Sequence, residues 1–198
     1  YEMFRFLEYE TSKLPPSDYY YVKKINHALQ SIEGAQKALV EGLDNEDWDV
    51  RRLCSYLLEL QDWTPDNTTQ KIKYIVSLGK EWSKLEEFGR EAVPYIIDSL
   101  NQTLNLGSND TRLEVLGNIG DDSATLPLIK ILIKIPKKQG DTYKILANVL
   151  LKFPNIEEEF ERLRLYDKAI EFYNYHGMLE KAASFKHKKA EMSAPKTE

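Results

Sequence analysis

The sequence predicts an all-α protein with the architecture of an α-α superhelix, in which helical hairpins stack between capping helices. Three observations predict it. Apolar residues recur at spacings of three and four, and no segment alternates as a strand would; the spacing is clear in Tyr21, Ile25, Ala28, Leu29 and Ile32. The 9 glycines and 8 prolines fall mostly between these periodic segments, which indicates short helices and short connections. The third observation is an internal repeat of a helical segment.

The composition is typical of a soluble globular chain. The 198 residues are 42% hydrophobic, and 27 basic against 32 acidic residues give a net charge of −5. A chain of this size buries enough surface to fold without a disulfide or a metal. Cys54 is the only cysteine, which excludes an internal disulfide and a Cys-based zinc site. The most apolar stretch, 126–135, is interrupted by Pro127, Lys130 and Lys134, so we expect no membrane span and a cytoplasmic location.

The N-terminal segment, 1–31, is expected to be a helical element that leads into the repeats. Pro15-Pro16 breaks the chain, and Ser17 and Asp18 then supply a helix cap and a negative charge at the helix start. The sequence begins at Tyr1 rather than Met and shows no signal-peptide pattern. We therefore expect it to be a trimmed piece whose upstream part is not visible.

Three segments align without gaps on the pattern A-x-x-x-[LI]-[VI]-x-x-L. They are 35–43, 92–100 and 124–132, with offsets of 57 and 32 residues, so a longer element lies between the first two. On a helix the alanine, the middle apolar pair and the last leucine share one face. We therefore predict that Leu43, Leu100 and Leu132 are equivalent buried positions.

Each copy of the repeat precedes a second helical segment, at 48–60, 110–119 and 141–153. Capping residues stand before several of these helices. Asp47 precedes Trp48, Asn109 and Asp110 precede the next segment, and further helix starts are expected at 66–68 and 121–123. Helix pairs repeated at this period are typical of a solenoid, in which each pair buries its apolar face on its neighbours.

The repeat region, 32–153, resembles the HEAT-like repeats of the phycobilin-lyase type. The string from Ile119 to Ala124, followed by Pro127, Ile129 and Leu132, carries the resemblance, and Asp49-Val-Arg51-Arg resembles the start of the second helix of such a repeat. The stretch from Trp63 to Val93 is similar to the linking segment of many such prokaryotic proteins. The resemblance implies stacked helix pairs whose second helices line an inner surface. Two departures are a second helix at 110–119 that is a turn short and Asp141-Thr-Tyr in place of Asp-x-Arg.

The C-terminal part, 154–192, contains a second internal repeat. The segment 165–172 aligns with 178–185, and Ala169 and Ala182 stand at matching positions where two helices can pack closely. With Gly177 at the turn, this stretch resembles a tetratricopeptide hairpin, which we expect to cap the array. The tail, 193–198, is expected to be disordered.

No residue pattern points to catalysis or metal binding. His27, His176 and His187 lack a second histidine or carboxylate at a ligand spacing, and His176 is expected at a helix C-terminus, where a cation suits the helix dipole. Cys54 stands among apolar residues and is expected to be buried rather than nucleophilic. Paired carboxylates such as Asp121-Asp122 are explained as helix starts or solvated faces, and no glycine-rich phosphate loop is present. We therefore predict that the protein is not an enzyme and needs no metal or cofactor.

The sequence predicts a scaffold or adaptor that binds another protein through the helical-repeat surface. The residues expected to line the inner surface combine cationic, aromatic and hydroxyl groups suited to an acidic protein segment. They are Arg51, Arg52, Tyr56, Arg112, Tyr143 and Lys144. In the competing interpretation, Arg51 and Arg112 pair with aspartates such as Asp49 or Asp121 and only hold the stack. A second possible partner patch lies in Tyr19-Tyr20-Tyr21 beside Phe4 or Tyr9, whereas Trp48, Trp63 and Trp82 are expected to be packing anchors.

Two other functions stay open. Some HEAT-like proteins are DNA glycosylases or bind nucleic acid, but the net charge of −5 and the short basic runs argue against a duplex as partner, because affinity for DNA comes largely from neutralising phosphates. The family resemblance also suggests a phycobilin lyase or chromophore-handling protein. No residue here supplies chemistry for that role, and no small-molecule substrate is evident.

Overall fold

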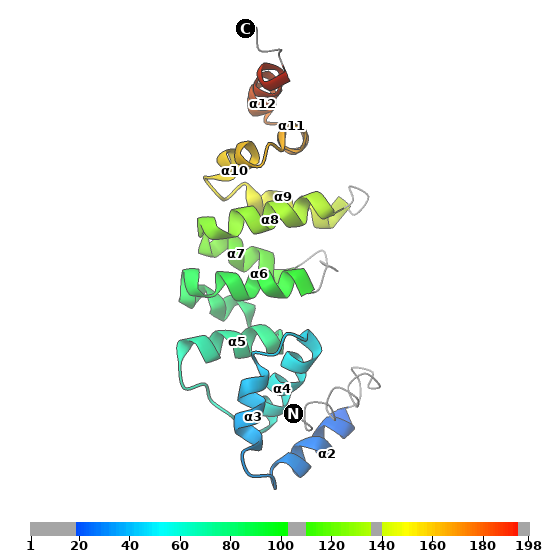
Figure 1. Cartoon of the computed structure of the whole chain (residues 1–198), viewed down its shortest axis with the longest axis vertical. Coiled ribbons are helices and arrows are strands. Elements are labelled where there is room, and N and C mark those ends of the chain that lie inside the picture. The colour runs from blue at the N-terminus through cyan, green and yellow to red at the C-terminus, as the bar shows by residue number, and fades with distance from the viewer. Residues whose placement is uncertain (1–18, 103–109, 136–139, 194–198) are drawn as a thin grey trace. The chain divides into compact units, whose positions relative to one another are not determined.

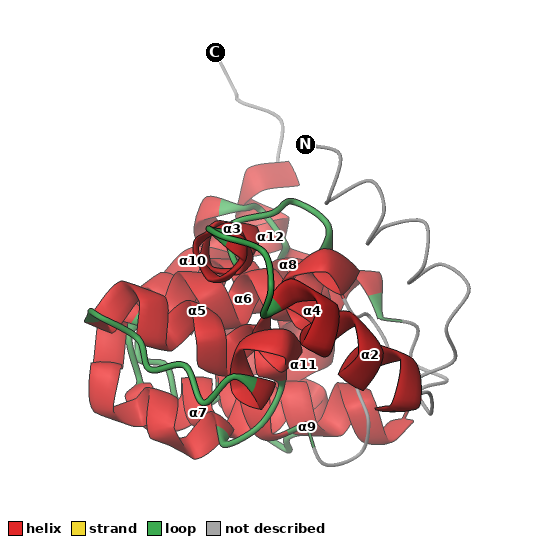
Figure 2. Ribbon diagram, turned by 90° about the horizontal axis from the view of Figure 1, so that it is seen from below, coloured by secondary structure: helices red, strands yellow, loops and turns green. Residues whose placement is uncertain are grey.

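The computed structural model describes residues 19–102, 110–135 and 140–193, and in these ranges the chain forms helices, turns and loops without a strand (Figures 1 and 2). The predicted all-α class is therefore confirmed. The chain divides into two compact units, 1–104 and 105–198. The division falls inside the predicted repeat region, 32–153, in a stretch that lies outside the described residues.

Unit 1 contains five α-helices and one 3-10 helix in its described part. They are α2 (Tyr19–Leu29), α3 (Ala35–Gly42), α4 (Trp48–Leu60), α5 (Thr68–Leu78), η1 (Trp82–Glu91) and α6 (Val93–Gln102). Helix α4 contacts α2, α3 and α5, and α5 contacts η1 and α6. The first repeat copy and its second segment thus form the predicted hairpin, α3 and α4.

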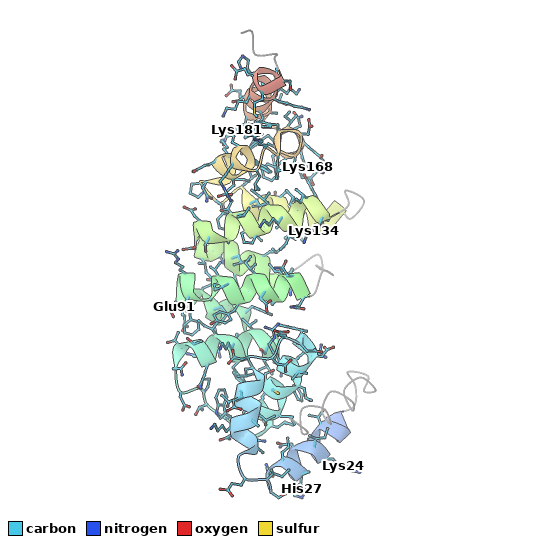
Figure 3. All side chains as sticks on the ribbon, in the orientation of Figure 1. Lys24, His27, Glu91, Lys134, Lys168 and Lys181 are labelled. Atoms are coloured by element: carbon cyan, nitrogen blue, oxygen red, sulfur yellow. The ribbon has the colours of Figure 1, made fainter. Side chains whose placement is uncertain are left out.

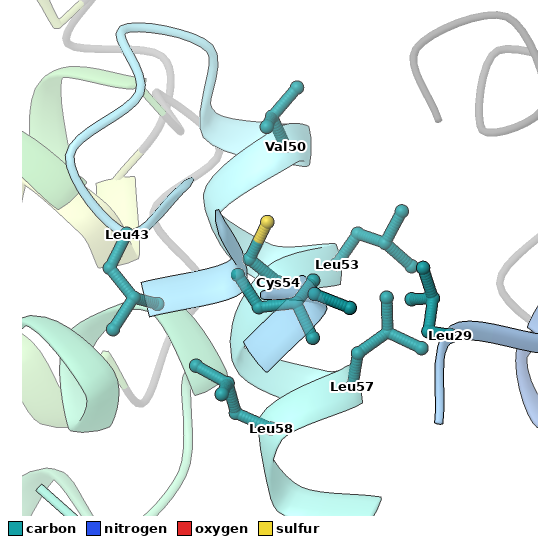
Figure 4. Close-up of a cluster of buried hydrophobic side chains, with 9 residues drawn as sticks. Leu29, Leu43, Val50, Leu53, Cys54, Leu57 and Leu58 are labelled. Carbon is teal, nitrogen blue, oxygen red and sulfur yellow. The ribbon is translucent and has the colours of Figure 1, made fainter. Parts of the chain in front are cut away.

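The core of unit 1 forms where α2 and α3 pack on α4 (Figure 4). Leu39, Cys54, Leu57 and Leu58 are fully buried there. Trp63 and Tyr74 pack against this core with their rings in an edge-to-face pair, 5.5 Å between centroids. The core exists because α4 places apolar side chains on one face at helical spacing.

The predicted helix starts are capped by short polar side chains. The carboxylate of Asp47 accepts hydrogen bonds from the backbone N–H groups of Asp49 (2.8 Å) and Val50 (3.4 Å), and Asn67 accepts one from Gln70 N–H (3.0 Å). Asp110 and Asp121 cap α7 and the short helix η2 in the same way. These contacts satisfy backbone donors that a helix start leaves without intrahelical partners. The start predicted at Ser17 and Asp18 lies outside the described residues.

The offset of 57 residues between the first two repeat copies contains α4, α5 and η1. Gly79 ends α5 in the left-handed conformation (φ 69°), and Gly89 breaks the regular backbone within η1 (φ 50°, ψ −129°). Both values favour glycine because a side chain there would crowd the backbone. The linking element therefore brings Leu85 into the core and returns the chain at α6.

Unit 2 contains six α-helices and one 3-10 helix in its described part. They are α7 (Thr111–Ile119), η2 (Asp122–Ala124), α8 (Thr125–Lys134), α9 (Gly140–Leu150), α10 (Ile156–Arg162), α11 (Tyr166–Tyr175) and α12 (Leu179–Ser193). Helix α9 contacts α7 and α8, α10 contacts α8 and α11, and α11 packs along α12. At nine residues, α7 is shorter than the thirteen-residue α4, as the sequence predicts.

The three repeat copies place the same positions in the core. Leu43, Leu100 and Leu132 are 2%, 0% and 4% exposed. The first alanine of each copy is buried as well, at Ala35, Ala92 and Ala124. The predicted register of the repeat is therefore confirmed at these positions.

The C-terminal hairpin is formed by α11 and α12, with Gly177 at the turn (φ 68°). Ala169 and Ala182 are buried, as expected for a close approach of two helices, and Phe160 of α10 packs on the rings of Phe172 and Phe185. Ser193 is the last residue of α12 rather than the start of a disordered tail, which corrects that prediction, and 194–198 lie outside the described residues.

Candidate functional site

An open stripe runs along the side of α4 that faces away from the core of unit 1. Arg52, Tyr56 and Glu59 stand at helical spacings of four and three, so their side chains share one side of the helix. Arg52 is exposed, whereas Tyr56 and Glu59 are half-buried. The stripe is open because Val50, Cys54 and Leu57 turn the opposite side of α4 into the core.

Lys80 joins this stripe from the loop after α5. Its Nζ donates to both carboxylate oxygens of Glu59, at 3.0 and 2.9 Å, and lies 5.3 Å from the centre of the Tyr56 ring. The hydrogen bond to Glu59 raises the pKa of Lys80, so the ammonium keeps its charge. Arg52, Tyr56, Glu59 and Lys80 are called the α4 surface from here on.

Tyr74, whose ring pairs with that of Trp63, lies close enough to the α4 surface to feel the charge of Glu59. Burial raises the pKa of Tyr74, and the nearby charges of Glu59 and Glu81 raise it further, so the phenol stays neutral. Aromatic side chains anchored in a core lose little conformational entropy on binding and supply contact area. Lys80 and Tyr74 were not predicted as site residues, because Lys80 is 24 positions away from Tyr56 and only the packing of α5 on α4 brings them together.

Arg51 is held inside unit 1 rather than presented on an open surface. Its Nη1 donates to Asp98 Oδ2 of α6 at 2.7 Å, and its guanidinium lies 5.1 Å from the centre of the Trp48 ring. The side chain is 16% exposed. The partner is Asp98 and not Asp49, because Asp49 lies next to the cap of the same helix and faces solvent. Arg51 thus joins α4 to α6.

Arg112 also forms an ion pair within the fold, with Asp110 at the start of its own helix. Its Nε and Nη2 donate to the two carboxylate oxygens of Asp110, at 2.8 and 2.5 Å, and the two side chains are 11% and 6% exposed. The predicted alternative partner, Asp121, instead caps η2. Asp110 therefore caps α7 and binds Arg112 at the same time.

Tyr143 and Lys144 differ in exposure although they are adjacent. Tyr143 is 9% exposed, and its ring makes an edge-to-face contact with Tyr175, 5.4 Å between centroids. Burial, with a smaller contribution from Tyr175, raises the pKa of Tyr143. Lys144 is exposed. Of the six predicted residues, the structure leaves Arg52 and Tyr56 accessible in unit 1 and Lys144 in unit 2, and packs the other three into the fold. The other predicted patch, around Phe4, Tyr9 and the side chains of Tyr19, Tyr20 and Tyr21, lies outside the described part.

Two further features of the described residues concern the binding of metals and small molecules. No group of three or more His, Cys, Asp or Glu side chains in the described ranges could hold a metal ion. Glu191 stands four positions after His187, and its Oε1 lies 3.4 Å from His187 Nδ1, which corrects the expectation that His187 lacks a carboxylate at a ligand spacing. An open pocket of about 530 Å³ lies between α2, α3 and the end of α4, but Lys37 is the only ionisable residue of its lining. Its lining residues are Leu29, Gln30, Ile32, Gly34, Ala35, Gln36, Lys37 and Gln61.

Cys54 lies in the core of unit 1 and is fully buried (Figure 4). Burial raises the pKa of its thiol to about 12. Because the thiolate is the reactive form, we expect native Cys54 to react with a thiol reagent at least 100 times more slowly than the urea-unfolded protein, roughly as the thiolate fraction falls. Absorbance with a disulfide reagent measures both rates. Equal rates would show that the α4 core opens easily.

His176 stands at the C-terminal end of α11, as predicted, but its surroundings do not favour the protonated imidazole that was expected there. It packs against the rings of Phe172 and Tyr175, at 4.9 and 5.2 Å, and its Nε2 is buried with no hydrogen-bond partner in the described part of the chain. Burial therefore lowers the pKa of His176 below that of an unfolded histidine.

The lowered pKa predicts a pH dependence of stability. The unfolded chain binds a proton at His176 near pH 6.5, whereas the folded chain binds it only at lower pH, so stability is full above about pH 7 and falls as the pH drops through the folded pKa. We expect His176→Gln to show a smaller loss of melting temperature between pH 7.5 and 5.5 than the wild type. His27→Gln, which removes an exposed imidazole, is the control. Equal losses in all three proteins would contradict the assignment.

Comparison with protein-family models, curated proteins and solved structures finds no match to this chain. Among the described helices, none combines the length and the apolar character needed to cross a bilayer. The chain is an all-α protein of two compact units.

Proposed function

We propose that the protein is a non-enzymatic scaffold that binds another protein, and that the α4 surface is one of its contact sites. The observation that carries the proposal is the combination of Arg52, Tyr56 and Lys80 on one open stripe of α4, whose opposite side forms the core on which Trp63 and Tyr74 pack. Arginine, tyrosine and tryptophan are the residues most enriched among those that dominate binding energies. A rigid core behind the stripe lowers the entropic cost of binding.

The same proposal assigns the helix pairs to a HEAT-like array. The equal burial of the alanine and leucine positions in three copies supports it, since a repeat that packs only on its neighbours must reuse the same core positions. A surface built in this way changes its outer residues without loss of the stack, which suits a binding module.

The test begins with a photo-crosslinking amino acid at position 52, and at the exposed position 37 as control, in lysate of the source cell. A protein crosslinked at 52 but not at 37 is then purified and titrated against Arg52→Glu/Tyr56→Ala. We expect the double variant to bind at least roughly tenfold more weakly, since central Arg and Tyr contacts each contribute about 1 kcal/mol or more. Its melting temperature should stay close to that of the wild type.

Two results would overturn the proposal. One is a double variant that stays folded and binds the purified protein as tightly as the wild type. The other is tight binding of a 20-base-pair DNA duplex with a steep salt dependence, which would indicate a nucleic-acid partner instead.

A further inference from the structure

Helix α8 carries an outer stripe in unit 2 that is both cationic and apolar. Leu126, Lys130 and Ile133 stand at spacings of four and three, and Pro127 and Lys134 lie beside them on the same side of the helix. Lys130 and Lys134 are exposed, Ile133 is 38% exposed, and Leu126 and Pro127 are half-buried. Figure 3 labels Lys134 near the end of α8. These five residues are called the α8 stripe.

The α8 stripe lies in a segment of opposite charge to the whole chain. Residues 125–140 contain four lysines and no Asp or Glu, although the chain carries a net charge of −5. Neither Lys130 nor Lys134 has an ion pair with any described residue. Several other lysines of unit 2 do have partners within the fold: Lys181 pairs with Glu157, and Lys189 with Asp167. The two α8 lysines are therefore left for an external charge.

The internal repeat allows these residues to be compared with those at the same positions of the other two copies. In the alignment of the three copies, Lys130 stands where the first copy has Glu41 and the second has Asp98, and Ile133 stands where they have Asp44 and Asn101. The buried positions keep their alanine and leucine in all three copies. Positions that are acidic or polar in the first two copies are thus cationic and apolar in the third, at a site where an exposed isoleucine contributes little to the core.

We propose that the α8 stripe docks an acidic amphipathic helix of a partner protein. Lys130 and Lys134 are one helical turn apart, which matches two carboxylates spaced one turn apart on a facing helix, and Ile133 and Leu126 offer apolar contact to a leucine between them. Charge complementarity selects the partner and speeds its association. A bilayer is a poorer fit because few apolar atoms are exposed, and a duplex is a poorer fit because apolar side chains gain nothing from phosphates.

The test uses two fluorescein-labelled synthetic peptides of the same composition. In the patterned peptide, Glu-Leu-Leu-Glu-Glu-Leu-Leu-Glu occurs two times in succession, and in the permuted peptide the same residues stand in an order without helical spacing. Fluorescence anisotropy measures binding to the full chain at 50 and 300 mM NaCl. We expect the patterned peptide to bind at least roughly fivefold more tightly than the permuted one and to weaken at high salt, since exposed ion pairs are screened.

Charge and apolar variants then locate the contact. Lys130→Glu and Ile133→Ser should each weaken binding roughly fivefold or more, consistent with about 1 kcal/mol per contact. Lys186→Glu is the matched control, because Lys186 is an exposed lysine on α12 with no ion pair among the described residues. Circular dichroism checks that each variant is folded, and Lys130→Gln repeats the test with a milder change.

Any of four results would overturn the proposal. They are no binding of the patterned peptide, equal binding of both peptides, equal weakening by Lys130→Glu and Lys186→Glu, and tighter binding of phosphatidylserine vesicles or duplex DNA than of the peptide. The α8 stripe and the α4 surface share no residue. A negative result for one proposal therefore does not count against the other.

Discussion

Phe160→Ala is expected to lower the free energy of unfolding of unit 2 by about 3–5 kcal/mol, the usual cost of removing a large aromatic side chain from a core. Phe160 is fully buried and packs on Phe172 (5.5 Å between centroids), Tyr173 and Phe185 (both 6.3 Å). It therefore joins α10 to both helices of the C-terminal hairpin. Tryptophan fluorescence reports directly on unit 1 only, because Trp48, Trp63 and Trp82 all lie there. Circular dichroism is the suitable measurement.

The control for this prediction is Leu179→Ala on the same hairpin. Leu179 is 68% exposed, so its truncation removes little buried surface and should change stability by less than about 0.5 kcal/mol. Similar effects of the two variants would show that the aromatic cluster does not form the core of the hairpin.

Leu132→Ala should lower the free energy of unfolding by about 2–5 kcal/mol through lost apolar burial and the cavity left behind. Leu132 is 4% exposed on α8, which contacts α9 and α10. The adjacent Ile133 is 38% exposed and supplies an internal control of similar size. Ile133→Ala should have a clearly smaller effect, so the difference between the two variants measures the register of the repeat directly.

An equal loss of stability in Leu132→Ala and Ile133→Ala would mean that α8 is rotated about its axis relative to the register argued here. That result would also count against the proposed binding role of the α8 stripe, since this role requires Ile133 to face solvent. Chemical denaturation followed by circular dichroism is the measurement. Because the chain divides into two compact units, the unfolding curves are fitted with one and with two transitions.

Local features of the chain were predictable from the sequence because they depend on residues close together along it. The helices, the caps at Asp47, Asn67 and Asp110, and the burial of the repeat leucines follow from helical spacing and from the backbone donors that a helix start leaves open. Cys54 was expected in the core because its neighbours on α4 are apolar.

Contacts between distant residues required the tertiary structure. Whether Arg51 faces solvent or Asp98 depends on how α6 lies against α4 although the two residues are 47 positions apart, and repeat spacing carries no signal for that geometry. Tyr143 is buried because Tyr175 of α11 packs against it, and His176 favours its neutral form because aromatic rings surround it. The sequence by itself determined the helices and which of their faces are apolar, since both follow from short-range periodicity. Only the packing of helix on helix decided which polar and aromatic side chains stay open to a partner, because that depends on neighbours that periodicity does not identify.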